Sequence, residues 1–135
     1  MKVIDFGFST FVGENEKGTV FCGTPAYMSP EIVEKRNHCY FKADIWALGV
    51  VLYTLMSGKF PFKGESNKDL FNKIKRAQYS LPEGISIEAK ALLLKLLQID
   101  PEKRISSDQT LEDNWLSELK NSSQDFHKVT SAYLD

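Results

Sequence analysis

The chain has 135 residues, of which 42% are hydrophobic and 26% charged, a composition typical of one globular domain. Its net charge of -1 excludes a general attraction to nucleic acid or to anionic membranes, so neither is expected as a partner. The longest apolar stretch, residues 45–56, is too short to span a bilayer. Two cysteines without metal-ligand spacing are typical of reduced thiols, so we expect a cytoplasmic protein, with the nucleus also open.

The N-terminal part of the chain lacks a regular pattern. Residues 2–4 are suited to a short strand, which would end in a turn near Gly7. From Gly7 to Pro30 the sequence has little periodicity and contains several glycines and hydroxyls, which indicates a long loop. Loops of this length in compact domains are usually functional or disordered. A short helix is then predicted over residues 31–36, with Pro30 in its first turn.

The rest of the chain predicts a helical core. Residues 42–57 are apolar nearly all round and end at Gly58, a pattern that predicts a buried central helix. Amphipathic helices are predicted over residues 66–78, 86–98 and 106–119. The predicted fold is therefore mainly α with little or no sheet, and residues 118–135 are expected to form a flexible tail.

Capping signals support two of these helices. Ser66 and Asp69 have the spacing of an N-terminal capping pair, and Ser106 and Gln109 have the spacing of a capping box. Such pairs satisfy the free backbone N–H groups of a first turn. Both helices are therefore predicted to begin at a serine.

Several short motifs occur in order along the chain. They are Asp5-Phe6-Gly7, Gly23-Thr24-Pro25-Ala26-Tyr27, Ser29-Pro30-Glu31, Asp44-Ile45-Trp46-Ala47-Leu48-Gly49, and Arg104 after Asp100-Pro101. Each alone arises by chance in many proteins, but the ordered set is specific. The set resembles the C-terminal lobe of a eukaryotic protein kinase domain over residues 2–117. It is most similar to serine/threonine kinases of the calcium/calmodulin-dependent kinase-like group.

This resemblance implies a metal and nucleotide site near the N-terminus. The family position matched by Asp5 binds Mg²⁺ against the phosphates of ATP. Phe6 would pack beneath that site, and Gly7 would let the segment change conformation. Thr24 matches a threonine that orients the catalytic aspartate. Without the other motifs, Asp5 and Gly7 would be typical of a turn that closes a strand.

The resemblance also divides the matched region, residues 1–117, into an activation segment (residues 5–31) and a helical core (residues 42–117). In many family members a phosphorylated threonine stands at the position of Val20. Here the nearest hydroxyl is Thr19, so the loop either uses Thr19 or needs no phosphate. Gly23, Pro25 and Tyr27 match the surface that docks the protein substrate.

Other residues match structural positions of the family. Glu31 and Arg104 match a buried ion pair that fastens the end of the activation segment to the late helices, although either charge alone could be solvated. Asp44 matches an aspartate that accepts hydrogen bonds from the catalytic-loop backbone, or it is simply an acidic residue near a helix N-terminus. His38 and His127 have no ligand partners at suitable spacing, so we expect both to face solvent.

The 135 residues contain no glycine-rich phosphate loop and no His-Arg-Asp catalytic loop. The resemblance therefore implies part of a serine/threonine kinase that uses ATP and Mg²⁺ to phosphorylate proteins, and we expect this part alone to be inactive. The alternative is a non-catalytic interaction module derived from a kinase. An unrelated helical bundle would leave the ordered motifs unexplained. Uncovered apolar surface on residues 2–8 and the central helix is expected to favour self-association.

Overall fold

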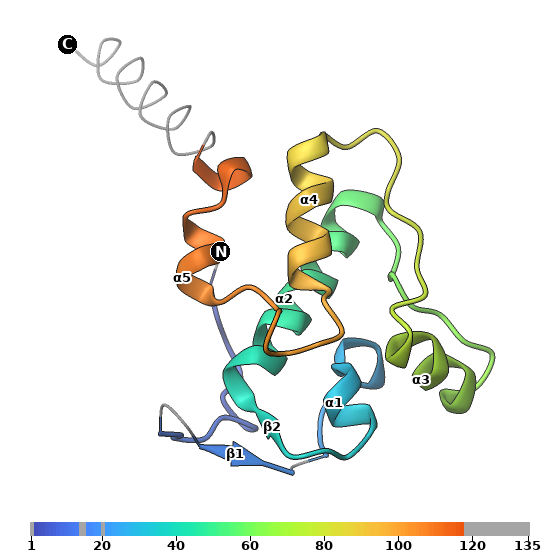
Figure 1. Ribbon diagram of the computed structural model, residues 1–135. Coiled ribbons are helices and arrows are strands. Elements are labelled where there is room, and N and C mark those ends of the chain that lie inside the picture. The colour runs from blue at the N-terminus through green and yellow to red at the C-terminus, as the bar shows by residue number, and fades with distance from the viewer. Residues whose placement is uncertain (1, 14–15, 20, 118–135) are drawn as a thin grey trace.

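The computed structural model describes residues 2–13, 16–19 and 21–117, and these are mostly helical (Figure 1). The predicted mainly α fold is confirmed, with one small antiparallel sheet in which Lys17 lies opposite Cys39 and Gly18 opposite His38. In chain order the elements are β1 (Lys17–Gly18), the 3-10 turn η1 (Pro25–Tyr27), α1 (Pro30–Val33), β2 (His38–Cys39), α2 (Tyr40–Ser57), α3 (Asn67–Lys75), α4 (Ile87–Leu96) and α5 (Ser107–Leu111).

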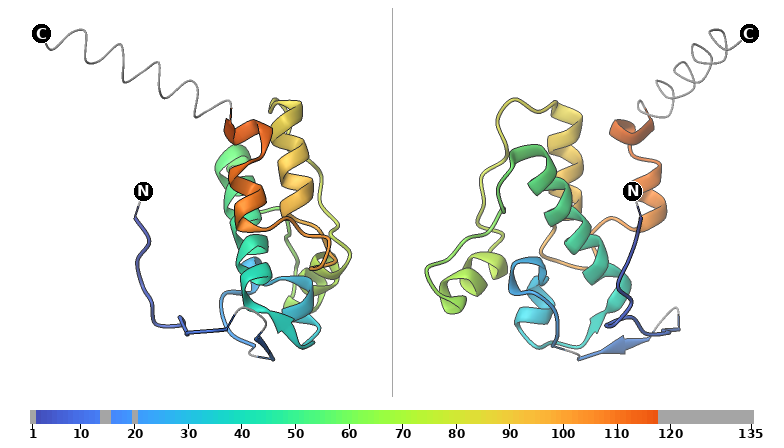
Figure 2. Two further views of the ribbon diagram at one scale, coloured as in Figure 1. Left: turned by 60° about the vertical axis from the view of Figure 1, so that its left-hand side comes forward. Right: turned by 180° about the vertical axis from the view of Figure 1, so that it is seen from behind.

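Helix α2 packs beside α4, and in the view from behind no described helix lies over its other side (Figure 1, Figure 2). It begins at Tyr40 rather than Lys42, and it ends, as predicted, before Gly58. Gly58 has a φ of 67°, which favours glycine, and its N–H donates to the Thr54 carbonyl at 2.8 Å. No helix among the described residues, α2 included, is long and apolar enough to cross a membrane.

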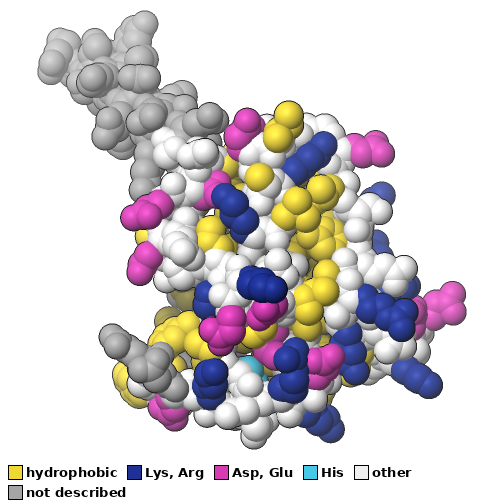
Figure 3. Space-filling model, in the orientation of Figure 1, with side chains coloured by type: hydrophobic (Ala, Val, Ile, Leu, Met, Phe, Trp, Pro, Cys, Tyr) yellow, Lys and Arg dark blue, Asp and Glu magenta, His cyan; other side chains and the backbone are white. Residues whose placement is uncertain are grey.

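Helix α4 packs against α2 at Gly49. A Cβ atom built on Gly49 would lie 2.9 Å from Cβ of Leu96 and 3.0 Å from Cδ2 of Leu97. Carbon atoms do not approach so closely without strain, so only glycine, which has no side chain, fits at this contact. Hydrophobic side chains gather on the face that Figure 3 shows, in the region of α4. Leu94 of α4 is 53% exposed and lines a groove with Leu81.

An aromatic cluster joins α2 to the segments that follow it. The rings of Trp46 and Phe62 are nearly parallel at 7°, with centroids 5.6 Å apart. Tyr79 packs edge-on against Phe62 at 5.4 Å and against Tyr53 at 5.9 Å. The Tyr53 hydroxyl donates to the Ser80 carbonyl at 2.9 Å. The indole N–H of Trp46 has no acceptor within the described chain, so packing and ring contacts hold this side chain.

Serine side chains begin the three amphipathic helices. The Oγ atoms of Ser66, Ser86 and Ser106 each accept a hydrogen bond at 3.2 Å from the backbone N–H three residues later. At Ser106 the Gln109 side chain also accepts from the serine N–H at 3.0 Å, which completes the predicted capping box. The local sequence therefore determines where these helices begin.

The last predicted helix is interrupted. Helix α5 ends at Leu111, and residues 114–117 are helical again. Between them, Oδ1 of Asp113 accepts from the Trp115 N–H at 3.1 Å, and Oδ2 pairs with Lys95 of α4 at 2.6 Å. The prediction of one continuous helix was wrong because Asp113 caps a new turn and is anchored to α4. The predicted tail, residues 118–135, and His127 lie outside the described residues.

The strand predicted at residues 2–4 does not form. Val3 and Ile4 are 79% and 78% exposed, and the described strands pair only with each other. A strand needs a neighbouring strand for its backbone hydrogen bonds, and none of the described residues supplies one here. The prediction failed because strand propensity without a pairing partner does not form a sheet.

Candidate functional site

Arg104 is a buried arginine whose side chain is 0% exposed. A guanidinium group carries five N–H donors, and all five are used. Nε donates to the Gln98 carbonyl at 2.9 Å. Nη1 donates to Glu31 at 2.7 Å and to the Lys42 carbonyl at 2.6 Å. Nη2 donates to Glu31 at 3.0 Å and to the Ile99 carbonyl at 3.3 Å. The charge is therefore buried without an unsatisfied donor.

Glu31 supplies the opposite charge from α1, 73 positions earlier in the chain. Both of its carboxylate oxygens accept from Arg104, so the pair is bidentate. Burial alone raises the pKa of Glu31, but the hydrogen bonds and charge of Arg104 outweigh it, and the net pKa is lowered. The expected contact between Glu31 and Arg104 is present, and it ties α1 to the segment before α5.

Two further contacts attach Arg104 to α2. The guanidinium carbon lies 5.1 Å from the centroid of the Trp46 ring, a cation–π contact. The Lys42 ammonium donates to the Arg104 carbonyl while Arg104 donates to the Lys42 carbonyl. Sequence reasoning did not identify Lys42, because a lysine in the first turn of a helix gives no signal for a contact 62 positions away.

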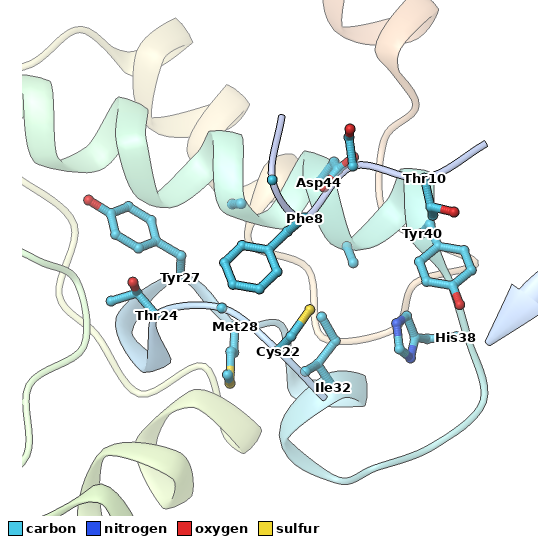
Figure 4. Close-up of a pocket in the computed structure, with 15 residues that line it drawn as sticks. Phe8, Thr10, Cys22, Thr24, Tyr27, Met28, Ile32, His38, Tyr40 and Asp44 are labelled. Carbon is cyan, nitrogen blue, oxygen red and sulfur yellow. The ribbon is translucent and has the colours of Figure 1, made fainter. Parts of the chain in front are cut away.

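A cavity of about 560 Å³ lies between the N-terminal segment, the loop before α1 and the first half of α2. Figure 4 shows the ring of Phe8 over this cavity, with Cys22 and Ile32 among the side chains around it. An apolar cavity with a few polar groups is typical of a site that receives a ligand or another protein segment. Its polar side chains include Thr24, His38 and Asp44.

Asp44 reaches this cavity from α2 (Figure 4). Partial burial raises the pKa of Asp44, and no hydrogen bond from a described residue offsets that effect. Thr24 lies at the other end of the cavity, and its hydroxyl does not cap η1. The contacts that the kinase resemblance implies for these two residues are therefore not made within the described chain.

The prediction that His38 faces solvent was wrong. His38 is 4% exposed. Its Nδ1 lies 3.0 Å from the Arg36 carbonyl, and its ring packs edge-on against Tyr40 at 5.3 Å. Since a carbonyl only accepts, this hydrogen bond assigns the proton to Nδ1.

The Asp5-Phe6-Gly7 motif forms an exposed turn. Asp5 has a φ of 63°, and its Oδ1 accepts from the Gly7 N–H at 3.2 Å. Phe6 is 69% exposed, so the packing implied beneath a nucleotide site is not formed by the described residues. Those residues also contain no cluster of three His, Cys, Asp or Glu side chains that could hold a metal. Asp5 can supply one ligand, but the described chain does not complete a metal site.

The candidate docking residues lie together in the turn before α1. Gly23 has a φ of 106°, a conformation that favours glycine. Pro25 begins η1, and the Tyr27 ring packs edge-on against Phe60 at 5.5 Å. Thr19 is separate from them, because it lies exposed directly after β1.

The ordered motifs and the buried ion pair lie within one matched region. The family model described as protein kinase domain matches residues 1–116. The chain belongs to the protein kinase family. Within this kinase domain match lie both partners of the ion pair, Glu31 and Arg104, and the cavity-lining Asp44.

This kinase-family chain is also similar to curated serine/threonine kinases. It is 36% identical over 120 residues to "Probable serine/threonine-protein kinase MARK-A" of Dictyostelium discoideum. It is 40% identical over 119 residues to CBL-interacting serine/threonine-protein kinase 5 of Arabidopsis thaliana, and 38% identical over 123 residues to serine/threonine-protein kinase atg1 of Dictyostelium discoideum. These matches cover 89%, 86% and 91% of this chain, but only 11%, 27% and 18% of the respective relatives.

Proposed function

We propose that this chain is the C-terminal lobe of a serine/threonine protein kinase domain, which transfers phosphate from ATP to a protein serine or threonine. The bidentate pair between Glu31 and Arg104 carries the proposal, because it joins two of the ordered motifs across 73 positions. Unrelated motifs would have no reason to meet in one buried contact. The names of the relatives support the serine/threonine class, and the motif pattern favours the calcium/calmodulin-dependent kinase-like group.

The proposed role of Asp5 is to bind Mg²⁺, with Phe6 and Gly7 beside the ATP phosphates. Bound Mg²⁺ would neutralise the charge that develops during phosphoryl transfer. The turn uses Oδ1 of Asp5, and the exposed carboxylate can approach a cation through Oδ2. ATP, water and other protein groups would supply the remaining ligands, because Mg²⁺ prefers six oxygens.

Residues 5–31 act as the activation segment in this proposal. Thr19 is exposed and therefore accessible to a modifying kinase. Its phosphorylation is one route to activation, and a loop that needs no phosphate is the other. Gly23, Pro25 and Tyr27 form the docking surface for the protein substrate, since they lie together in one turn.

Residues 42–117 act as the helical core. Asp44 accepts backbone hydrogen bonds from the catalytic loop, and Thr24 orients the catalytic aspartate. Both proposals are supported by the position of these side chains on one cavity, where their oxygens lack donors or acceptors from the described residues. We propose a cytoplasmic location, consistent with two free cysteines.

We expect residues 1–135 alone to transfer no phosphate. Positioning and charge stabilisation supply nearly all of the catalysis by a kinase, and this sequence contains no glycine-rich loop or catalytic base. A radiolabelled-ATP assay on the purified chain with a protein substrate is the test. Phosphate transfer that is abolished by Asp5→Asn would contradict the expected inactivity. A chain that joins the missing kinase motifs to residues 1–135 should be active, and Asp5→Asn should abolish its activity.

The second candidate is a non-catalytic interaction module. The exposed Phe8 ring over an apolar cavity favours it, because this arrangement can receive a segment of another protein. If the joined chain stays inactive although it folds, the interaction module becomes the better assignment.

A further inference from the structure

A lysine just after α1 lies over an aromatic ring of the loop that precedes η1. The Lys35 ammonium is 5.5 Å from the centroid of the Phe21 ring, a cation–π contact. The Phe21 ring in turn packs edge-on against Phe71 of α3, with the two centroids 6.4 Å apart. Helices α1 and α3 are in contact and lie side by side (Figure 1). Phe21 therefore connects Lys35 to the surface of α3.

Two further lysines flank Phe71 on α3. Lys68 stands three positions before Phe71 and Lys75 four positions after it, so the three residues share one face of the helix. Lys35, Lys68 and Lys75 make no ion pair among the described residues. We call these three lysines, together with the rings of Phe21 and Phe71, the lysine patch. The patch presents three positive charges around an aromatic centre.

The acidic residues nearest to the patch in sequence do not neutralise it. Glu34 pairs with Arg36 at 2.6 Å. Asp69 pairs with Lys73 at 3.0 Å, and these two residues lie on a different face of α3 from the patch. Glu65 comes before α3, is exposed, and makes no ion pair among the described residues. The positive charge of the patch is therefore available to an anionic group from outside the described chain.

The backbone of Lys35 has a conformation that is unusual for lysine. Its φ is 55°, in the left-handed region where a side chain causes strain and glycine does not. The Lys35 N–H donates to the Ile32 carbonyl at 2.9 Å, and the Arg36 N–H donates to the Glu31 carbonyl at 3.0 Å, so this turn ends α1. Glycine would end the helix with less strain. The lysine adds the charged side chain that lies over Phe21, which gives the strained residue a use in binding.

We propose that the lysine patch binds acidic residues of the protein substrate, close to the serine or threonine that receives the phosphate. This inference rests on the proposed function, in which Gly23, Pro25 and Tyr27 dock the substrate. Phe21 stands two positions before Gly23, and η1 contacts α3, so a segment docked on that turn reaches the patch. The patch is separate from the cavity that contains Asp44, because none of its five residues lines that cavity.

The spacing of the patch fits an extended acidic segment. Lys68 and Lys75 are two helical turns apart, about 10 Å along the axis. An extended chain rises about 3.3 Å per residue, so two acidic side chains three positions apart can pair with both lysines. Phe21 is 44% exposed, which leaves an apolar surface for a neighbouring substrate side chain. The net charge of -1 on the whole chain disfavours a long polyanion such as nucleic acid, so a short acidic segment is the better fit.

Fluorescence anisotropy with labelled peptides tests the patch on residues 1–135. Two probes carry one serine and two glutamates three positions apart, placed after the serine in one probe and before it in the other. At low salt, at least one probe should bind about tenfold more tightly than the same peptide with glutamines, and added salt should remove the difference. Equal affinities of the glutamate and glutamine peptides, or no measurable binding, would overturn the proposal.

Charge-removing variants locate the binding. A triple variant with Lys35→Gln, Lys68→Gln and Lys75→Gln should lose the preference for glutamate. The matched control replaces Lys2, Lys90 and Lys103 by glutamine, which removes the same charge outside the patch. Equal losses in the two triple variants would overturn the proposal, because net charge alone would then explain the binding.

Two further measurements secure this comparison. Lys68→Gln together with Lys75→Gln leaves the strained turn at Lys35 unchanged and should still lose part of the preference, and circular dichroism verifies that each variant is folded. A single-stranded oligonucleotide serves as a competing polyanion. If it binds more tightly than the acidic peptides and depends on the same lysines, the patch binds nucleic acid and the proposal fails.

A chain that joins the missing kinase motifs to residues 1–135 separates this proposal from the proposed function. The ratio of kcat/KM for the glutamate peptide to that for the glutamine peptide should be about ten, and the patch variant should bring this ratio towards one. An active enzyme with a ratio of one would overturn the patch and leave the kinase function standing. An inactive enzyme that still prefers the glutamate peptide in binding would overturn the kinase function and leave a patch for acidic segments.

Discussion

The helical body and the N-terminal segment of this chain differ in how far their side chains are buried and paired. In the body, Arg104 uses all five donors and Trp46 is 0% exposed. In residues 2–13, Val3 and Phe11 are 79% and 104% exposed. The body contains both partners of each of its main contacts, whereas the N-terminal segment has few partners among the described residues. A motif residue makes its expected contact only where its partner is among the described residues.

The two sides of α2 also differ in burial. One side buries Trp46 and Val50 completely, while the other leaves Leu55 75% exposed. Both sides are apolar in sequence, so apolar composition alone does not determine burial. Which side is covered depends on where α4 and the segments beside Phe62 and Arg104 pack.

Replacement of Arg104, which lies in the body, should lower the free energy of unfolding most. Arg104→Ala leaves the Glu31 carboxylate buried without an opposite charge, so the free energy of unfolding should fall by about 3–5 kcal/mol. Urea denaturation measures this. Arg104→Lys is the matched control, which retains the charge but not the bidentate contact, and it should recover only part of the loss. Wild-type stability in Arg104→Ala would show that the pair does not stabilise the body.

Glu31→Gln tests the pH dependence of the same contact. The pKa of Glu31 is lowered in the folded state, so its stabilisation is present above the ordinary value of 4.5 and is lost as the pH falls through the folded value. Glu31→Gln should therefore cost about 3 kcal/mol at neutral pH, and the difference from wild type should shrink in acid. Denaturation curves over a pH series measure this difference. A difference that stays constant as the pH falls below 4.5 would contradict the assigned role.

Gly49→Ala tests the packing of α2 against α4. Alanine has the higher helix propensity, worth about 1 kcal/mol, but its Cβ would lie 2.9 Å from the Leu96 Cβ. Overpacking of a core typically costs about 1–3 kcal/mol, so we expect a net loss of about 1 kcal/mol. Thermal denaturation measures it. A stabilised variant would show that the two helices separate easily.

Ser106→Ala removes the capping box of α5. We expect a loss of about 1 kcal/mol in unfolding free energy, because the Gln109 backbone N–H loses the Ser106 Oγ acceptor. Ser107→Ala is the matched control, since Ser107 is the first helical residue and is exposed. Equal effects of the two substitutions would show that the cap adds no stability.

Substitutions in the N-terminal segment should have the smallest effect. Val3→Ser and Ile4→Ser alter side chains that are 79% and 78% exposed, so stability should change by no more than about 0.5 kcal/mol. Val50→Ala, at a fully buried valine in α2, should cost much more in the same denaturation experiment. A large loss from Val3→Ser would show that the segment packs against the body, and the contrast between the two regions would fail.

The sequence alone determined the features that depend on neighbouring residues. Serine caps at Ser66 and Ser106 and the glycine stop at Gly58 were predicted correctly, because each acts within one helical turn. The motif order also predicted that Glu31 and Arg104 would meet. That prediction came from the family resemblance, since nothing in local propensity links residues 73 positions apart.

Tertiary structure decided which groups have partners. The contact of Lys42 depends on Arg104, and the interruption at Asp113 depends on Lys95. Which face of α2 is exposed likewise depends on which segments pack beside it. The physical reason is that burial and long-range hydrogen bonds are properties of pairs brought together by folding, whereas caps and turns are properties of a few adjacent residues.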